Sequence, residues 1–206
     1  MLNLTKISET TVTKNPYEYM VVNEVIEGRD LDQIINDYPN VPGPGSHPPV
    51  LFDIKGSFKN IVDELYSKEF QEIVEDKFNL SLKNRPKMYT IRGFCKKSDG
   101  KIHPDSKSKI ITCLLYLNQK VWDSQEIGGK LRILNDGHNL ENYVEEISPN
   151  GGTMLLFKRE NHSWHGHHSF EGQRRAIQLN WVKNNWVVWQ EQGRHNFNSF
   201  IKRTFK

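Results

Sequence analysis

Residues 101–118 read KIHPDSKSKIITCLLYLN, a polar segment that runs directly into an apolar one. The apolar part begins at Ile110 and predicts a buried strand. Just before it, His103 and Asp105 stand two residues apart, and side chains two apart in an extended chain point to the same side. The imidazole and the carboxylate can therefore bind one metal ion together, and a third ligand must come from elsewhere in the chain.

Residues 161–181, NHSWHGHHSFEGQRRAIQLNW, supply the candidates for that ligand. His165 and His167 share one face of an extended strand, and His162 and His168 lie close by, so periodicity alone does not choose among the four. Two histidines and one carboxylate on one face of an iron ion leave the opposite face open. That arrangement is typical of non-haem Fe(II) oxygenases.

The second half of the chain has the pattern of an all-β unit. Short apolar runs with alternating periodicity are separated by Gly, Asn, Asp and Pro, and this favours a sandwich or a barrel. The expected strands are residues 87–95, 109–117, 129–135, 142–148, 152–158 and 175–182.

The first half predicts helices with one strand before them. Residues 18–26 are expected to form that strand, residues 29–38 a helix, and residues 57–80 one broken helix or two short ones. The Pro- and Gly-rich residues 39–50 predict an irregular loop, either a substrate lid or a spacer. Residues 1–15 are polar and are expected to be loosely held.

The order of these features resembles the 2-oxoglutarate- and Fe(II)-dependent oxygenases of the prolyl-hydroxylase-like branch. His103-Pro104-Asp105, a strand, Gly128-Gly129, further strands, His165 and then two arginines follow one another over roughly residues 86–188. The resemblance implies a mainly β fold with N-terminal helices (α+β), whose core is a double-stranded β-helix, a cupin-like jelly-roll barrel. Residues 1–85 would buttress the core within one domain, residues 86–190 would form it, and residues 191–206 would add a basic helix or tail.

The same resemblance implies the ligands and cofactors. His103, Asp105 and His165 would be the catalytic Fe(II) ligands, with His167 the alternative to His165, and the bound molecules would be Fe(II), 2-oxoglutarate and O₂, with ascorbate compatible. In the family, the ligand histidine precedes an arginine by nine or ten residues. Counting from His165, these positions are Arg174 and Arg175.

The strand that follows indicates which arginine faces inward. The far carboxylate of 2-oxoglutarate needs a bidentate, permanently charged partner. Small polar residues alternate with apolar ones after the two arginines, and the polar set should line the cavity. Arg174 belongs to the polar set and Arg175 to the apolar one, so Arg174 is the predicted 2-oxoglutarate residue and Arg175 the alternative.

A second contact to that carboxylate is harder to place. Similar prolyl hydroxylases use a tyrosine on the second core strand. Here we expect the inward position to be Leu115, with the neighbouring Tyr116 facing outward. Tyr89, Thr112 and Gln178 are the remaining candidates for cofactor binding.

Composition excludes several other classes. The formal charge of +3 is small and mixed, which does not favour a nucleic-acid partner, although residues 193–206 are basic with aromatics between the charges. Cys95 and Cys113 suit buried thiols, and no apolar run approaches a membrane span, so we expect a cytoplasmic protein without a membrane partner. Its oligomeric state is not defined by the sequence.

The function implied is that of an oxidoreductase, a 2-oxoglutarate-dependent dioxygenase similar to prolyl 4-hydroxylases. It would decarboxylate 2-oxoglutarate to succinate and hydroxylate a C–H bond of a prolyl or related residue in a peptide, or of a small molecule. The alternatives are a nucleic-acid dealkylase of the same superfamily and a non-catalytic metal-binding jelly-roll module.

Overall fold

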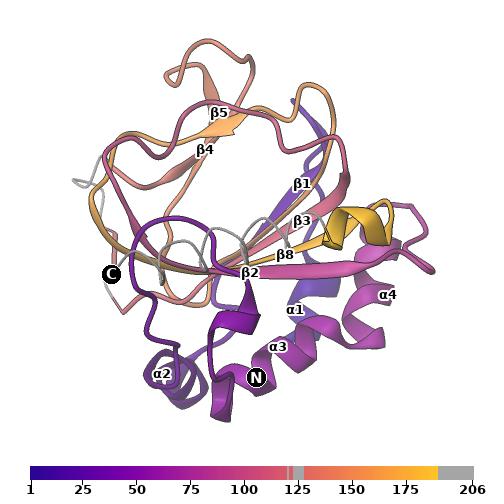
Figure 1. Ribbon diagram of the computed structural model, residues 1–206. Coiled ribbons are helices and arrows are strands. Elements are labelled where there is room, and N and C mark those ends of the chain that lie inside the picture. Colours follow the sequence, from indigo (N-terminus) through magenta and orange to yellow (C-terminus); the bar gives the residue numbers. More distant parts are fainter. Residues whose placement is uncertain (120, 123–127, 190–206) are drawn as a thin grey trace.

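The computed structural model describes residues 1–119, 121–122 and 128–189 of the chain (Figure 1). The labelled helices of this part are α1 (Leu4–Glu9), α2 (Gly28–Asn36), the 3₁₀ turn η1 (Pro49–Leu51), α3 (Gly56–Tyr66) and α4 (Lys68–Lys77), and residues 185–189 are helical as well. The strands are β1 (Tyr19–Val22), β2 (Lys87–Cys95), β3 (Lys109–Tyr116), β4 (Leu131–Leu134), β5 (Tyr143–Ile147), β6 (Met154–Lys158), β7 (His165–Gly166) and β8 (Gly172–Val182).

The strands form two antiparallel sheets. The larger has the order β1-β6-β3-β8-β2 and the smaller the order β5-β4-β7. Helices α1 to α4 lie on one side of the larger sheet, and β4 and β5 lie on its other side (Figure 1). The prediction of a mainly β protein with N-terminal helices is therefore confirmed, and β1 joins the N-terminal segment to the larger sheet.

Most elements follow the sequence pattern. Each of the six strands expected in the second half forms, and the expected helix over residues 57–80 is divided into α3 and α4. The division falls at Ser67, whose hydroxyl accepts a hydrogen bond from the Phe70 amide at 3.1 Å and caps α4. Strand β7 is only two residues long and was not predicted.

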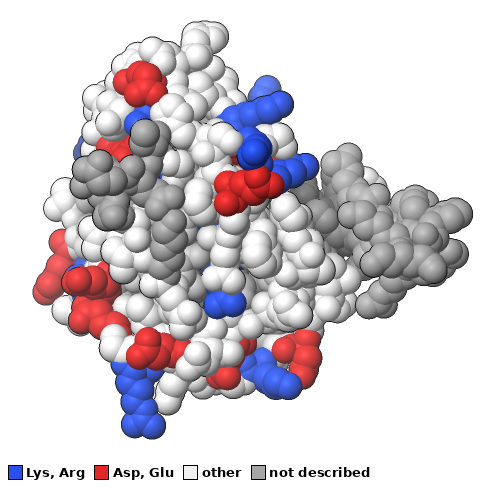
Figure 2. Space-filling model, turned by 90° about the vertical axis from the view of Figure 1, so that its left-hand side faces the viewer, with Lys and Arg blue, Asp and Glu red and all other residues white. Residues whose placement is uncertain are grey.

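Charges of both signs are interspersed on the surface. Figure 2 shows acidic and basic side chains scattered over one face of the molecule, with no continuous region of a single sign. This distribution agrees with the small formal charge.

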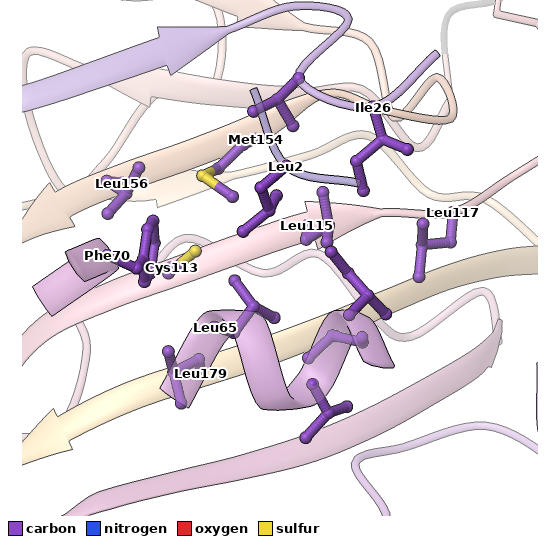
Figure 3. Close-up of a cluster of buried hydrophobic side chains, with 14 of the residues drawn as sticks. Leu2, Ile26, Leu65, Phe70, Cys113, Leu115, Leu117, Met154, Leu156 and Leu179 are labelled. Carbon is purple, nitrogen blue, oxygen red and sulfur yellow. The ribbon is translucent and has the colours of Figure 1, made fainter. Parts of the chain in front are cut away.

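The main hydrophobic core lies between the larger sheet and the helices. Figure 3 shows side chains of α3 and α4, such as Leu65 and Phe70, beside Leu115 of β3 and Leu179 of β8, all of them almost completely buried. On β3 and β8 the residues that face this core alternate with residues that face the smaller sheet. A second, smaller core lies on that inner side and includes Tyr17, Leu114, Tyr116 and Phe157.

The N-terminal residues are better ordered than expected. Residues 4–9 form helix α1, capped by Asn3, whose side-chain oxygen accepts a hydrogen bond from the Lys6 amide at 2.9 Å. Leu2 and Ile7 are buried in the main core, so the prediction of a loosely held segment is wrong. Two apolar side chains in a polar segment are enough to anchor a short helix when they pack into the hydrophobic core.

Two further expectations concern the rest of the chain. Cys95 and Cys113 are free and buried, as predicted. Among the described residues, none of the helices has the length and apolar character needed to cross a membrane. The expected basic helix or tail over residues 191–206 lies outside the described residues.

We predict that Ile7→Ala will lower the free energy of unfolding by about 2–5 kcal/mol, because the side chain is fully buried and its removal leaves a cavity. Urea denaturation followed by circular dichroism measures this change. Glu9→Ala, an exposed change in the same helix, serves as the control and should cost less than about 0.5 kcal/mol. Equal stability of the Ile7→Ala variant and the parent would show that α1 does not dock on the core.

Candidate metal and anion site

His103 and His165 are brought together by the backbone. The two residues form an isolated antiparallel bridge, in which the His103 amide donates to the His165 carbonyl at 3.0 Å and the His165 amide donates to the His103 carbonyl at 3.1 Å. Directly paired residues of an antiparallel ladder project to the same face. The two imidazole rings accordingly lie with their centroids 4.5 Å apart.

In both rings Nδ1 contacts a backbone carbonyl, which leaves Nε2 for a metal ion. His103 Nδ1 lies 2.7 Å from the Lys101 carbonyl oxygen, and His165 Nδ1 lies 3.0 Å from the Ser163 carbonyl oxygen. A carbonyl only accepts hydrogen bonds, so each Nδ1 must carry the proton and each Nε2 keeps its lone pair. This arrangement is the usual orientation of metal-binding histidines.

Asp105 completes the cluster and is 7% exposed. The Thr112 hydroxyl donates to Asp105 Oδ2, and Lys109 Nζ donates to Oδ1 at 2.8 Å. Thr112 Oγ1 also lies 3.0 Å from Asn180 Oδ1 of β8, and its single proton serves one of these two acceptors at a time. Each carboxylate oxygen has two lone pairs, so both retain one for a metal ion.

The protonation states suit a metal site. Burial would raise the pKa of Asp105, but the charges of Lys109 and His165 and the two hydrogen bonds outweigh it and hold the pKa at about 2. Burial lowers the pKa of His165 to about 4, so its ring is neutral at pH 7. One ligand atom from each of His103, Asp105 and His165 lies within 4.8 Å of the others, and the set can hold a metal ion.

The other histidines of the 161–168 segment have different surroundings. His162 is exposed and lies 3.1 Å from Glu160, while His168 contacts Glu141 and Arg132. His167 is buried at the cavity wall, and desolvation, with a contribution from the charge of Arg174, lowers its pKa to about 4. The structure brings only His165 of this segment within reach of His103 and Asp105.

Arg174 is the anion-binding candidate and is 4% exposed. Its Nε donates to the Gly129 carbonyl at 2.7 Å, and its Nη2 donates to the Tyr116 hydroxyl at 3.1 Å. No carboxylate of the described residues lies within ion-pair distance of the guanidinium. A buried, oriented and uncompensated guanidinium is suited to bind an anion.

Arg175 points to the opposite side of β8. Its Nη1 donates to the Ile35 carbonyl at 3.4 Å, and its guanidinium lies 5.0 Å from the ring centroid of Tyr38 on the helix side. The facing expected from the alternation on β8 is therefore the one observed, with Arg174 inward and Arg175 outward.

The expectation about Leu115 and Tyr116 is wrong. Tyr116 faces inward, against Arg174, and Leu115 packs with the helices. Thr112 was placed correctly in the cavity, and residues an odd number of positions apart on a regular strand cannot share a face, so Thr112 and Leu115 were incompatible choices. The even spacing of Thr112, Leu114 and Tyr116 was the signal that identifies the tyrosine.

The remaining candidates divide between the two faces. Thr112 and Gln178 line the cavity, whereas Tyr89 does not, because it packs against Tyr66 on the helix side at 5.9 Å between ring centroids. The cavity is about 400 Å³ in volume, and the metal cluster and Arg174 both open into it. Gly45 and Ser46 of the 39–50 loop form part of its wall.

The fold and this site define a class of protein: two antiparallel sheets with a cavity that contains a His-Asp-His cluster able to hold a metal ion and a buried arginine. Residues 89–183 match the profile of the 2OG-Fe(II) oxygenase superfamily. The predicted resemblance to the 2-oxoglutarate- and Fe(II)-dependent oxygenases of the prolyl-hydroxylase-like branch is confirmed by this match. A comparison with curated proteins found no match.

Solved structures with a similar fold include three prolyl hydroxylases. The Trichoplax adhaerens enzyme, solved with a peptide fragment of the hypoxia-inducible factor oxygen degradation domain, has 17% identity, covers 87% of this chain and 88% of its own, and gives a TM-score of 0.55. The Phytophthora capsici prolyl 4-hydroxylase has 14% identity, coverages of 81% and 59%, and a TM-score of 0.50. The Pseudomonas putida prolyl 4-hydroxylase has 15% identity, coverages of 62% and 65%, and a TM-score of 0.45, so the chain spans just under two thirds of that enzyme.

We predict that Thr112→Val will weaken metal binding by about 10- to 100-fold, because the Asp105 carboxylate loses the hydroxyl that orients it. Equilibrium dialysis with Mn(II) measures the affinity. Valine keeps the shape of threonine, so the fold is retained.

Ser108→Ala is the matched control. Its hydroxyl contacts only the nearby Ser106, so the affinity for Mn(II) should not change. An affinity of the Thr112→Val variant within twofold of the parent would show that this hydrogen bond does not support the ligand.

Proposed function

We propose that the chain is a Fe(II)- and 2-oxoglutarate-dependent dioxygenase that hydroxylates a C–H bond of a prolyl or related residue in a peptide. The observation that carries this proposal is the presence, in one cavity, of the His103, Asp105 and His165 cluster and the Arg174–Tyr116 pair. The reaction consumes 2-oxoglutarate, O₂ and the C–H substrate, and gives succinate, CO₂ and the alcohol.

His103, Asp105 and His165 would hold the iron. Two neutral imidazoles and one carboxylate fit Fe(II), and Thr112 and the Lys101 and Ser163 carbonyls keep these donors oriented. The bound iron supplies the redox chemistry that activates O₂ and couples the decarboxylation of 2-oxoglutarate to oxidation of the substrate.

Arg174 and Tyr116 would hold the far carboxylate of 2-oxoglutarate. The Gly129 carbonyl and the Tyr116 hydroxyl fix the plane of the guanidinium, which leaves nitrogen donors for a carboxylate. The apolar side chains of Leu114, Leu131 and Phe157 line the same cavity, and they would keep water from the chain of the bound co-substrate. The proposal therefore assigns cofactor binding to Arg174 and not to Arg175, whose guanidinium lies on the helix side.

We also propose that the two sheets are the two layers of a double-stranded β-helix. Inward side chains of β3 and β8 meet side chains of β4 across the smaller core, as that fold requires. Residues 86–190 would then form the catalytic core, and residues 1–85 a supporting part of the same domain.

A prolyl or related residue is proposed as the substrate because of the prolyl-hydroxylase relatives. The Trichoplax adhaerens enzyme was solved with a peptide, which supports a peptide substrate here by analogy of fold. The alternative, a nucleic-acid dealkylase, depended on the basic residues 193–206, which lie outside the described residues.

We predict that anaerobic addition of Fe(II) and then 2-oxoglutarate will produce the visible metal-to-ligand charge-transfer band of the chelate. Arg174→Gln should still bind Fe(II) but should weaken 2-oxoglutarate binding by about 2–5 kcal/mol, because a buried charged partner is lost. Titration of the band gives the affinity.

Arg175→Gln is the control, since it removes the same charge one residue away on the other face of β8, and it should leave the band intact. If iron binds to the parent protein and no band forms, the oxygenase proposal fails and the metal-binding module becomes the better interpretation. Loss of the band in Arg175→Gln instead would show that the wrong arginine has been chosen.

A further inference from the structure

A second arginine, Arg92 of β2, faces the same cavity. Its Nε donates to the Ser46 hydroxyl at 2.9 Å, and its side chain has no other hydrogen bond to a described residue. No described carboxylate lies within ion-pair distance of it. The other nitrogens of its guanidinium are therefore available to a ligand.

The proposed co-substrate does not account for this charge. Iron would take one carboxylate of 2-oxoglutarate and Arg174 the other, so the dianion is fully matched without Arg92. Asp105 is already paired with Lys109. The remaining acid at the cavity wall, Asp99, accepts a hydrogen bond from the Lys96 amide and makes no ion pair with Arg92.

Keeping such a charge in the cavity wall has a cost. Burial lowers the pKa of Arg92, and the neighbouring charge of Arg174 lowers it further. Arg92 is partly exposed, so its guanidinium is less well solvated than in water and is favoured by an accompanying anion. Among the described residues, the side-chain partner of Arg92 is the neutral hydroxyl of Ser46. This hydroxyl does not balance the positive charge of the guanidinium.

The side chains of Arg92 and Arg174 are directed to different parts of the cavity wall. Arg92 is paired with Ala176 in the β2–β8 ladder, so it is a diagonal neighbour of Arg174 on the inner face. Their side chains diverge from there. Arg174 extends toward Tyr116 on β3 and the Gly129 carbonyl, whereas Arg92 extends toward Ser46, beyond the outer edge of β2.

The 39–50 loop holds Ser46 in place at this edge. His47 and Ile91 exchange two backbone hydrogen bonds of 3.0 and 2.8 Å, and Pro44 forms a bridge with Phe94. The Pro- and Gly-rich loop is thus fixed to the edge strand at two points, with Gly45 and Ser46 lining the cavity between them. The result is a polar corner made of one guanidinium, one hydroxyl and exposed backbone.

We propose that this corner, formed by Arg92 and Ser46, binds an oxyanion carried by the substrate. The substrate is then an acidic molecule, or a residue next to an acidic group, whose carboxylate or phosphate docks at the edge of β2 while its reacting carbon lies at the metal cluster. This inference rests on the proposed function, because Arg92 is free for the substrate only if Arg174 binds 2-oxoglutarate.

The test uses small oxyanions on the protein loaded with Mn(II) and 2-oxoglutarate. Acetate and methyl phosphate are titrated at constant ionic strength, with acetamide as the uncharged probe, and the melting temperature is followed. An anion that binds the folded protein raises its melting temperature in a saturable way. We expect a rise with acetate, with methyl phosphate or with both, and none with acetamide, and the anion that acts tells which group the substrate carries.

Arg92→Gln should abolish the rise and leave the affinity for 2-oxoglutarate within about threefold of the parent, and Arg92→Lys should restore part of the rise. Lys97→Gln, which removes an exposed charge close to the end of β2, is the control and should behave as the parent does. The retained affinity for 2-oxoglutarate shows that each variant is folded.

Three results would overturn the inference: no response to either anion, an unchanged response in Arg92→Gln, or a loss of 2-oxoglutarate binding in Arg92→Gln as large as in Arg174→Gln. Failure of the parent to bind 2-oxoglutarate would instead contradict the proposed function. In that case the acetate and methyl phosphate titrations are repeated without 2-oxoglutarate in the Arg174→Gln variant. A rise in melting temperature that is lost on adding Arg92→Gln would still support anion binding by Arg92.

Discussion

The candidate site depends on one backbone interaction, the antiparallel bridge between His103 and His165. His165 also pairs with Ile133 of β4, whereas His103 lies on the connection between β2 and β3 of the larger sheet. The bridge therefore joins the two sheets at the point where the imidazoles project. Without it, two of the three candidate ligands would belong to separate layers, and their ring separation would not be fixed.

The surroundings of this bridge orient the ligands before any metal arrives. Carbonyl oxygens hold both Nδ1 atoms, the Tyr17 hydroxyl donates to the Trp164 carbonyl at 3.1 Å beside β7, and Thr112 and Lys109 hold Asp105. Such fixed donors lose little conformational freedom when an ion binds. The groups that hold Asp105 and the two Nδ1 atoms are close to each ligand in the sequence, whereas the Tyr17 hydroxyl reaches β7 from the N-terminal segment.

Most strands and most of the candidate site residues could be predicted from the local sequence pattern, and the wrong predictions have physical causes. The alternation after Arg174 was sufficient to place Arg174 in the cavity and Arg175 on the helix side, because β8 is a long regular strand. Tyr116 was misplaced because Leu115 was taken as the inward position, although its odd spacing from Thr112 puts it on the other face of the strand. Helix α1 and strand β7 were missed because their stability comes from tertiary contacts, and segments this short carry little periodicity of their own. Arg92 was overlooked for a similar reason: its partner Ser46 lies in a loop whose position against β2 depends on backbone bridges.

The distribution of charge in the cavity connects stability with ligand binding. Arg92 and Arg174 both face the cavity without a described carboxylate within ion-pair distance, and both lie on strands whose backbone pairing fixes their direction. Evolutionary replacement by apolar residues of similar size would be expected to stabilise the empty fold. Their presence therefore implies anions that offset their desolvation when they bind, and each anion then stabilises the folded chain by mass action. Because Arg92 is directed to Ser46 and Arg174 to Tyr116 and the Gly129 carbonyl, the two guanidinium groups serve different positions, and the proposed role of the second one is to select for charge on the substrate itself.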